Sequence, residues 1–287
     1  MISAILFISF FVFLILGLPI AICLGLSSVC AILYSGTSLT IVATNMYSGI
    51  SKFLLLAIPF FVLSGNIMAK AGISKRLINF VDTCVGHKKG GIAIVCVIVA
   101  CFFGAISGSG PATVAALGAV LIPAMVEQGG FSAPFSTALM ATSSSIAIVI
   151  PPSIAFVVYA SCTDTSVGAL FSAGIIPGIL VGVSYLIAAM FASKNVDVQM
   201  LPKATAAERW KAFKEAFWAL LMPVIILGGI YGGIFTPTEA AGVSVIYGLF
   251  VGVFIYREIH AKELVKIFVD AAVSSATIMF IIACAAV

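Results

Sequence analysis

The chain has 287 residues, of which 62% are hydrophobic and only 8% are charged. A soluble domain carries about 25% charged residues, so this composition excludes an ordinary soluble protein and predicts an integral membrane protein. The net charge of +4 is no sign of nucleic-acid binding, because the basic residues lie between long uncharged runs, at 52, 70–89, 194–214 and 257–266. Cytoplasmic segments of membrane proteins are enriched in Lys and Arg in this way.

The first uncharged run is too long for one upright helix. Residues 3–33 would span roughly 46 Å as a helix, whereas the hydrocarbon core is about 30 Å thick. We therefore predict a tilted helix that is broken near Gly17-Leu18-Pro19. A short interfacial piece at 38–49 and a crossing at 53–69 follow, so residues 1–70 are predicted to be N-terminal scaffold helices.

The stretch between the basic segments 70–89 and 194–214 must cross the membrane an even number of times, because both segments are assigned to the cytoplasm. Two of its parts suit ordinary crossings: residues 131–162 and the return at 166–192. The remaining part, residues 91–126, must then enter and leave on the same side. It is predicted to be a re-entrant helical hairpin.

Two polar breaks lie in this stretch. The hairpin tip reads Ser107-Gly108-Ser109-Gly110-Pro111, and Pro151-Pro152 interrupts the 131–162 crossing within "TSSSIAIVIPPSIAF". Non-helical backbone at membrane depth is tolerated only where it is buried in protein or lines a cavity. Freed carbonyls and hydroxyls are hard, neutral oxygen ligands, and half-helix N-termini favour an anionic group. The two breaks together predict a site for Na⁺ and an anion; the alternative is that Gly and Pro only permit close helix packing.

Further along, residues 193–216 are predicted to be a cytoplasmic linker with an interfacial helix, which begins at the capping-box pair Thr205 and Glu208. Residues 217–235 then cross outward and residues 239–256 return. Thr236 and Glu239 mark the start of the returning helix, with Pro237 at its first position. A further crossing begins at 268.

Asp164 is interpreted as the N-cap of the helix 166–192. The seven cysteines lie at 23, 30, 84, 96, 101, 162 and 284. They include no CxxC pair and are interpreted as small apolar residues.

Four segments carry a family resemblance: "AISGSGPATVAALGAVLIPAMVEQG", "VIPPSIAFVVYA", "GIIPGIL" and "FTPTEAAGV". Together they resemble the large membrane subunit of tripartite ATP-independent periplasmic (TRAP) transporters, which belong to a wider ion-transporter superfamily. The resemblance implies an all-α polytopic protein with inverted repeats and an elevator-type moving domain. Residues 91–192 would be the first transport-domain repeat, and residues 217–287 would begin a second repeat that is incomplete in this chain.

The resemblance also implies a function and residues for it. Such subunits are multi-pass proteins of the bacterial inner membrane that import an organic anion with a Na⁺ gradient. They work with a small membrane subunit and a periplasmic substrate-binding protein, and need no cofactor besides the coupling ion. The implied Na⁺ ligands are Ser107 and Ser109 with the backbone at Ala147, Ile150 and Pro152. The implied substrate residues are Gly108, Gly110, Ser143, Ser144, Ser145, Pro151 and Ser153.

The chain departs from the family pattern where Ser143 to Ser145 and Pro111 stand, and the anion itself is not identified. A stand-alone Na⁺/dicarboxylate symporter and a non-transporting membrane scaffold or enzyme subunit are the alternative functions. Catalysis is not expected, because the sequence has no HExxH, no close carboxylate pair and no Ser with a His base. A channel is less favoured, because the breaks form a site and not a lined pore.

Overall fold

The computed structural model describes residues 1–195 and 203–287, and every regular element in these ranges is a helix. Residues 196–202, which belong to the predicted linker 193–216, lie outside the described residues. The elements are α1 (Ile2–Ile15), α2 (Ile20–Ser35), α3 (Thr40–Ile50), η1 (Phe53–Leu56), α4 (Ala57–Lys70), α5 (Ile73–Val85), α6 (Gly91–Ser107), α7 (Gly110–Glu127), α8 (Ala133–Ser144), α9 (Ile146–Val149), α10 (Ile154–Thr163), α11 (Val167–Ala192), η2 (Ser193–Asn195), α12 (Ala206–Tyr231), α13 (Pro237–Phe250), the π-helix η3 (Val251–Ile255) and α14 (Ala261–Ala285).

Several of these helices are suited to a bilayer. Among the described residues, six helical segments are long and apolar enough to cross a membrane, and the bent pair Ala133–Val149 and Ile154–Thr163 would make a seventh span. The side chains on their outer faces are mostly large and apolar, as a lipid environment requires. These findings confirm the membrane protein that the composition predicts and the all-α polytopic architecture that the resemblance implies.

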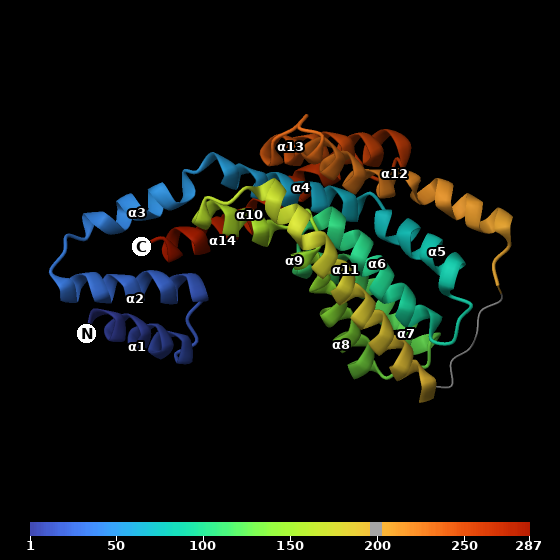
Figure 1. Ribbon diagram of the computed structural model, residues 1–287, viewed down its shortest axis with the longest axis horizontal. Helices are drawn as coiled ribbons and strands as arrows, with labels where there is room; N and C mark the ends of the chain where they lie inside the picture. The colour runs from blue at the N-terminus through green and yellow to red at the C-terminus, as the bar shows by residue number, and fades with distance from the viewer. Residues whose placement is uncertain (196–202) are drawn as a thin grey trace.

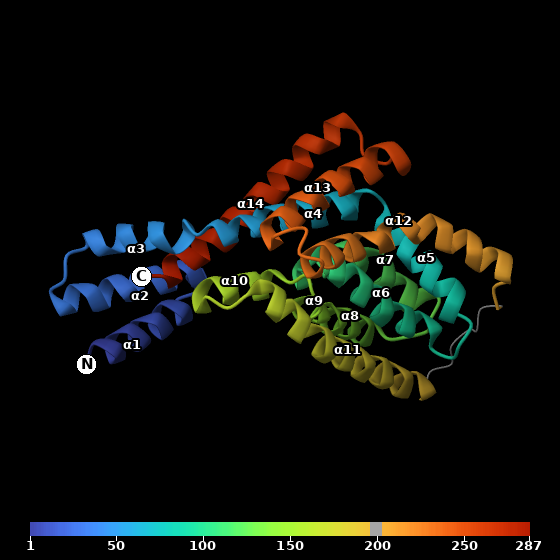
Figure 2. The same cartoon turned by 45° about the horizontal axis from the view of Figure 1, so that its top comes forward.

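Helix α4 lies at the centre of the molecule (Figure 1). It packs against α13 and α14 on one side and against α6 on the other. Helices α1 to α3 extend away from this centre as an arm, and the C-terminal part of α14 reaches back to pack on α2 and α3 (Figures 1 and 2). Small residues permit this contact: a Cβ on Gly49 would collide with the side chain of Ala286.

Helices α5 to α11 form a bundle beside α4 (Figure 1). Helix α6 is its core, because it contacts α5, α7, α8, α9 and α11. Most of its surface is buried, with Val95, Val99 and Phe103 among the residues that carry no exposed surface. The predicted hairpin 91–126 corresponds to α6 and α7, and the predicted broken crossing 131–162 corresponds to α8, α9 and α10.

The structure differs from the sequence-based expectations in three places. The chain does break at Gly17–Pro19, but α1 and α2 fold back and pack along each other instead of forming one tilted helix. The basic segment 70–89 is mostly helical, because α5 is strongly amphipathic and buries Ile73, Leu77 and Val81. Helix α12 runs unbroken through the boundary expected at 216 and 217.

Two capping predictions are confirmed and one is wrong. Thr205–Glu208 and Thr236–Glu239 both form complete capping boxes. Asp164, in contrast, does not cap α11. It ends α10 in the left-handed conformation, at φ 54°, and Ser166 is the N-cap of α11 instead. A short polar side chain tolerates the left-handed region better than most, which explains Asp at this turn.

Candidate functional site

The hairpin tip is a two-residue turn between α6 and α7. Gly108 ends α6 in the left-handed region at φ 61°, a conformation that glycine adopts without strain. Ser109 then caps α7, and its Oγ accepts a hydrogen bond from the Ala112 amide at 3.4 Å. Within the turn, the Ser107 and Thr113 hydroxyls lie 3.1 Å apart, and Thr113 also donates to the Ser109 carbonyl at 2.9 Å. The tip is therefore held by hydroxyls and backbone.

The broken helix stops at the proline pair. Because proline has no N–H and its ring blocks the preceding turn, the α-helix ends at Val149 and resumes at Ile154, with a bend of 42° between the two parts. The Ser153 hydroxyl reaches back across the gap and donates to the Ile148 carbonyl at 2.6 Å. A buried hydroxyl thus satisfies one of the carbonyls that the break leaves without an amide partner.

The hairpin tip and the break meet directly. The Ile154 amide donates to the Gly108 carbonyl at 3.3 Å, so the two non-helical segments share a backbone hydrogen bond. A Cβ on Gly108 would come within 2.8 Å of the Pro152 carbonyl oxygen, and a Cβ on Gly104 within 2.9 Å of the Ala147 backbone. Contacts this short exclude a side chain larger than hydrogen at both positions. The glycines of this stretch therefore permit close approach of two backbones.

The structure brings together four of the five residues that the resemblance implies for Na⁺. Ser107 and Ser109 are on the tip, the Pro152 carbonyl faces Gly108, and Ala147 packs on Gly104 one turn below. Ile150 instead packs against α11, where a Cβ on Gly178 would lie 2.5 Å from its side chain. The surrounding oxygens belong to hydroxyls and carbonyls, which are the kinds of ligand that coordinate alkali cations in proteins.

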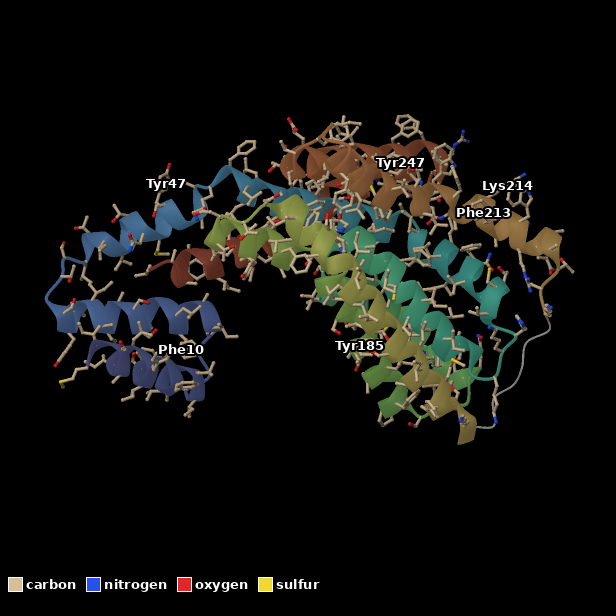
Figure 3. The ribbon with its side chains drawn as sticks, viewed as in Figure 1. Phe10, Tyr47, Tyr185, Phe213, Lys214 and Tyr247 are labelled. Atoms are coloured by element: carbon tan, nitrogen blue, oxygen red, sulfur yellow. The ribbon has the colours of Figure 1, made fainter. Side chains whose placement is uncertain are left out.

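The residues implied for the substrate do not all lie at the junction: some are at the tip and the break, and others contact α6, α8 or α11. A Cβ on Gly110 would lie 3.3 Å from the Ser144 carbonyl oxygen, and Pro151 and Ser153 are buried at the break. The Ser145 hydroxyl lies 3.1 Å from the hydroxyl of Tyr185 on α11, which is labelled in Figure 3. Ser144 donates to the Ala141 carbonyl. The Ser143 hydroxyl is fully buried beside the Cys96 thiol of α6.

A cavity of about 500 Å³ opens beside the hairpin tip on the side of α4 and α14. Its polar lining combines Ser107 and Ser109 of the tip with Asn66 of α4 and with Ser274 and Thr277 of α14. The last three were not predicted from the sequence. Asn66 was detectable as an amide inside the apolar run "IPFFVLSGNIM", but nothing in the sequence placed α14 beside the hairpin.

Charge is absent from this region. None of the residues that line the cavity is ionisable, and in the described ranges no cluster of His, Cys, Asp and Glu could hold a metal ion. A second cavity of about 610 Å³ lies between α5 and α12, where Asp82, Lys211 and Glu215 line it. That cavity is larger, but it is remote from both breaks. The chemistry of the site therefore rests on neutral oxygens.

Comparison with known proteins identifies the family. Residues 7–287 match the family described as "Tripartite ATP-independent periplasmic transporter, DctM component". The chain belongs to this family. It is 41% identical over 93% of its length to the C4-dicarboxylate TRAP transporter large permease protein DctM of Rhodobacter capsulatus, and covers 64% of that protein.

Other TRAP relatives differ in their named substrates. The chain is 38% identical over 95% of its length to the 2,3-diketo-L-gulonate TRAP transporter large permease protein YiaN of Escherichia coli, and covers 64% of it. It is 39% identical over 88% of its length to the sialic acid TRAP transporter large permease protein SiaM of Vibrio cholerae, and covers 58% of it. These relatives are permeases, which confirms that the TRAP chain is not an enzyme. It spans less than two thirds of their length.

Proposed function

We propose that this chain is part of the large membrane subunit of a Na⁺-coupled secondary transporter that imports a small organic anion. Membership of the TRAP large-permease family supports this proposal. Relatives are named for a C4-dicarboxylate, 2,3-diketo-L-gulonate, sialic acid and the sulfonate isethionate. All four are small organic anions and three of them are carboxylates, so a carboxylate is the substrate class that we assign. The subunit would work in the bacterial inner membrane with a small membrane subunit and a periplasmic substrate-binding protein.

The observation that carries the proposal is the junction of the hairpin tip and the broken helix. Ser107 and Ser109 would hold Na⁺ together with backbone carbonyls at Ala147, Ile150 and Pro152. The Gly108 position supports this assignment, because a methyl group there would fill the space beside the Pro152 carbonyl. Neutral oxygens hold the cation without a competing fixed charge, so that a bound Na⁺ makes the neighbouring space favourable for an anion.

The anion would lie beside this ion. Its contacts would come from the tip at Gly108 and Gly110, and from the broken helix at Ser143, Ser144, Ser145, Pro151 and Ser153. An elevator mechanism would move the bundle of α6 to α11 against α4, α13 and α14, with residues 217–287 opening the second inverted repeat.

A stand-alone Na⁺/dicarboxylate symporter is the second candidate within transport. It shares the ion site and differs in its partner: uptake would not depend on a binding protein. Uptake into proteoliposomes with and without the periplasmic binding protein separates the two. The similarity to TRAP permeases over more than nine tenths of the chain favours the binding-protein-dependent form.

The first test is thermal unfolding of the full-length protein with its small subunit. The Tm is measured in NaCl, KCl and choline chloride at equal ionic strength. An ion that binds only the folded state stabilises it by about 2.7 kcal/mol at a hundred times its Kd, so we expect a rise in Tm that is specific to NaCl. In Ser109→Ala the rise should shrink or disappear.

Ser132→Ala is the matched control. Ser132 caps α8 as Ser109 caps α7, each accepting a hydrogen bond from the amide three residues on, at 3.4 Å. Both variants lose about 1 kcal/mol of capping energy, but only Ser109 lies at the junction. The Na⁺-specific rise should survive in Ser132→Ala. Equal Tm values in all three salts would reject the sodium site.

A further inference from the structure

The carboxamide of Asn66 is unusual among the polar groups near the hairpin. It lies in the C-terminal half of α4, one turn before Lys70, in an apolar helix that buries Ile58, Phe61 and Ile67 almost completely. The side chain is half-buried and lines the 500 Å³ cavity. An amide in a membrane helix is costly unless it finds a polar partner. We therefore look for the hydrogen-bond partner of Asn66 in the cavity that it lines.

The position of Asn66 is fixed by its neighbour. A Cβ on Gly65 would lie 3.3 Å from the backbone and the Cβ of Ser107, so α4 rests directly on the end of α6 at this point. This contact brings the next residue, Asn66, to the same cavity as Ser107 and Ser109. The amide and the predicted ion ligands Ser107 and Ser109 thus line the same cavity from different helices. Because Gly65 and Ser107 are already in contact, α4 cannot move closer to the hairpin tip.

Helix α14 supplies the other polar wall. Ser274 and Thr277 are one turn apart and both line the cavity, with Val273 and Ile278 as apolar neighbours. The Thr277 hydroxyl donates to the Val273 carbonyl at 2.9 Å and keeps a lone pair for a further donor. A cavity of this size, mostly apolar with a few converging polar groups, is typical of a small-ligand site.

We propose that this cavity holds the body of the organic anion and that Asn66 is a substrate-contacting residue. The proposal rests on the transport function proposed above and adds α4 and α14 to the substrate site. The carboxamide donates to a carboxylate or hydroxyl oxygen of the anion, since an amide both donates and accepts. Ser274 and Thr277 face its remaining polar groups and contribute to the choice between anions.

The test uses the full-length protein with its small subunit and binding protein in proteoliposomes. Radiolabelled succinate, 2,3-diketo-L-gulonate and N-acetylneuraminate are the probes, and KM is measured at saturating Na⁺. Asn66→Leu keeps the volume and removes the polar atoms. We expect KM of the transported anion to rise at least 10-fold, with an unchanged Na⁺ concentration for half-maximal uptake. Asn66→Asp should raise KM further, because its carboxylate repels the anion.

Asn45→Leu is the matched control. Asn45 is also a half-buried amide on an apolar helix, α3, and it does not line this cavity. KM should not change in this variant. Thr277→Val gives a second, independent variant: it should alter the ratio of KM values among the probes.

Two results would overturn the inference, and they differ from each other. If the unsubstituted protein takes up a probe with Na⁺ and Asn66→Leu has the same KM, Asn66 does not contact the substrate, while the transport function stands. If the unsubstituted protein takes up none of the probes, the inference falls together with the proposed substrate class. In that case, a rise in Tm that is specific to Na⁺ would show that the ion site stands although the substrate assignment has failed.

Discussion

The junction of the hairpin tip with the broken helix is held in a different way from the charged end of the molecule. At the junction, backbones approach until no side chain fits, and the polar contacts are made by hydroxyls and by backbone amides and carbonyls. At the charged end, where α5 meets the turn between η3 and α14, one arginine joins neighbouring elements. The first arrangement is intolerant of added atoms, and the second depends on charge and is open to water.

Arg76 is the centre of the charged end. Its guanidinium lies 2.7 Å from the Glu258 carboxylate, 3.1 Å from the Gly72 carbonyl, and 3.9 Å above the centre of the Tyr256 ring. The Tyr256 hydroxyl donates to the Glu215 carbonyl of α12. Aromatic side chains of α12, among them Phe213, continue along this side of the molecule (Figure 3). Exposed ion pairs are individually weak, so this end is stabilised by many modest contacts.

The largest effect is expected from one methyl group at the junction. Gly108→Ala combines the strain of the left-handed region, about 1–2 kcal/mol for a residue with a Cβ, with overpacking against the Pro152 carbonyl, about 1–3 kcal/mol. We expect a loss of about 2–5 kcal/mol of unfolding free energy and loss of uptake. Thermal or denaturant unfolding in detergent, with uptake in proteoliposomes, measures both.

Gly36→Ala separates the two causes. Gly36 also ends a helix in the left-handed region, at φ 73°, but no atom lies within 4 Å of its added Cβ. It should lose only the conformational part, about 1–2 kcal/mol, and retain uptake. If both variants are destabilised equally, the close approach at the junction has no energetic weight, and the proposed contrast between the two regions is wrong.

A smaller effect is expected at the charged end. Arg76→Gln removes the ion pair with Glu258 and the contact with Tyr256, worth about 1–2 kcal/mol together. The loss should decrease as salt concentration rises, because the pair is partly exposed. Lys75→Gln, one residue away on the exposed side of α5, is the control and should leave the unfolding free energy within about 0.5 kcal/mol. A loss at Arg76 that is independent of salt would point to packing instead of charge.

These two regions also differ in how much of them could be predicted. The position of the junction could be predicted, because Ser107–Pro111 and Pro151-Pro152 interrupt an otherwise apolar run. Helix-breaking residues are tolerated at membrane depth only where the backbone is buried in protein or lines a cavity. The contact between Gly108 and Pro152 follows from tertiary packing, and no local pattern encodes it. Asn66 was missed because its role depends on α14, which is roughly 200 residues away in the sequence and which no local pattern places beside it. The helix α5 was missed because its charges hid a strong apolar face.

The smallest effect concerns Asp82, which lines the cavity between α5 and α12 beside the charged end, and it tests whether the surface of α5 is governed by electrostatics. Burial raises the pKa of the Asp82 carboxyl, and its Oδ1 has no hydrogen-bond partner among the described residues. Below the ordinary value of about 3.9, the group is protonated in the folded and unfolded states alike and its ionisation costs nothing. As pH rises from there through the higher folded pKa, the unfolded chain binds fewer protons than the folded chain, so stability falls. Asp82→Asn removes that loss, so the Tm of the variant minus that of the unsubstituted protein should be larger at about pH 7 than at about pH 4. A difference that is larger at the lower pH would mean that the Asp82 carboxylate has a stabilising partner in the folded protein.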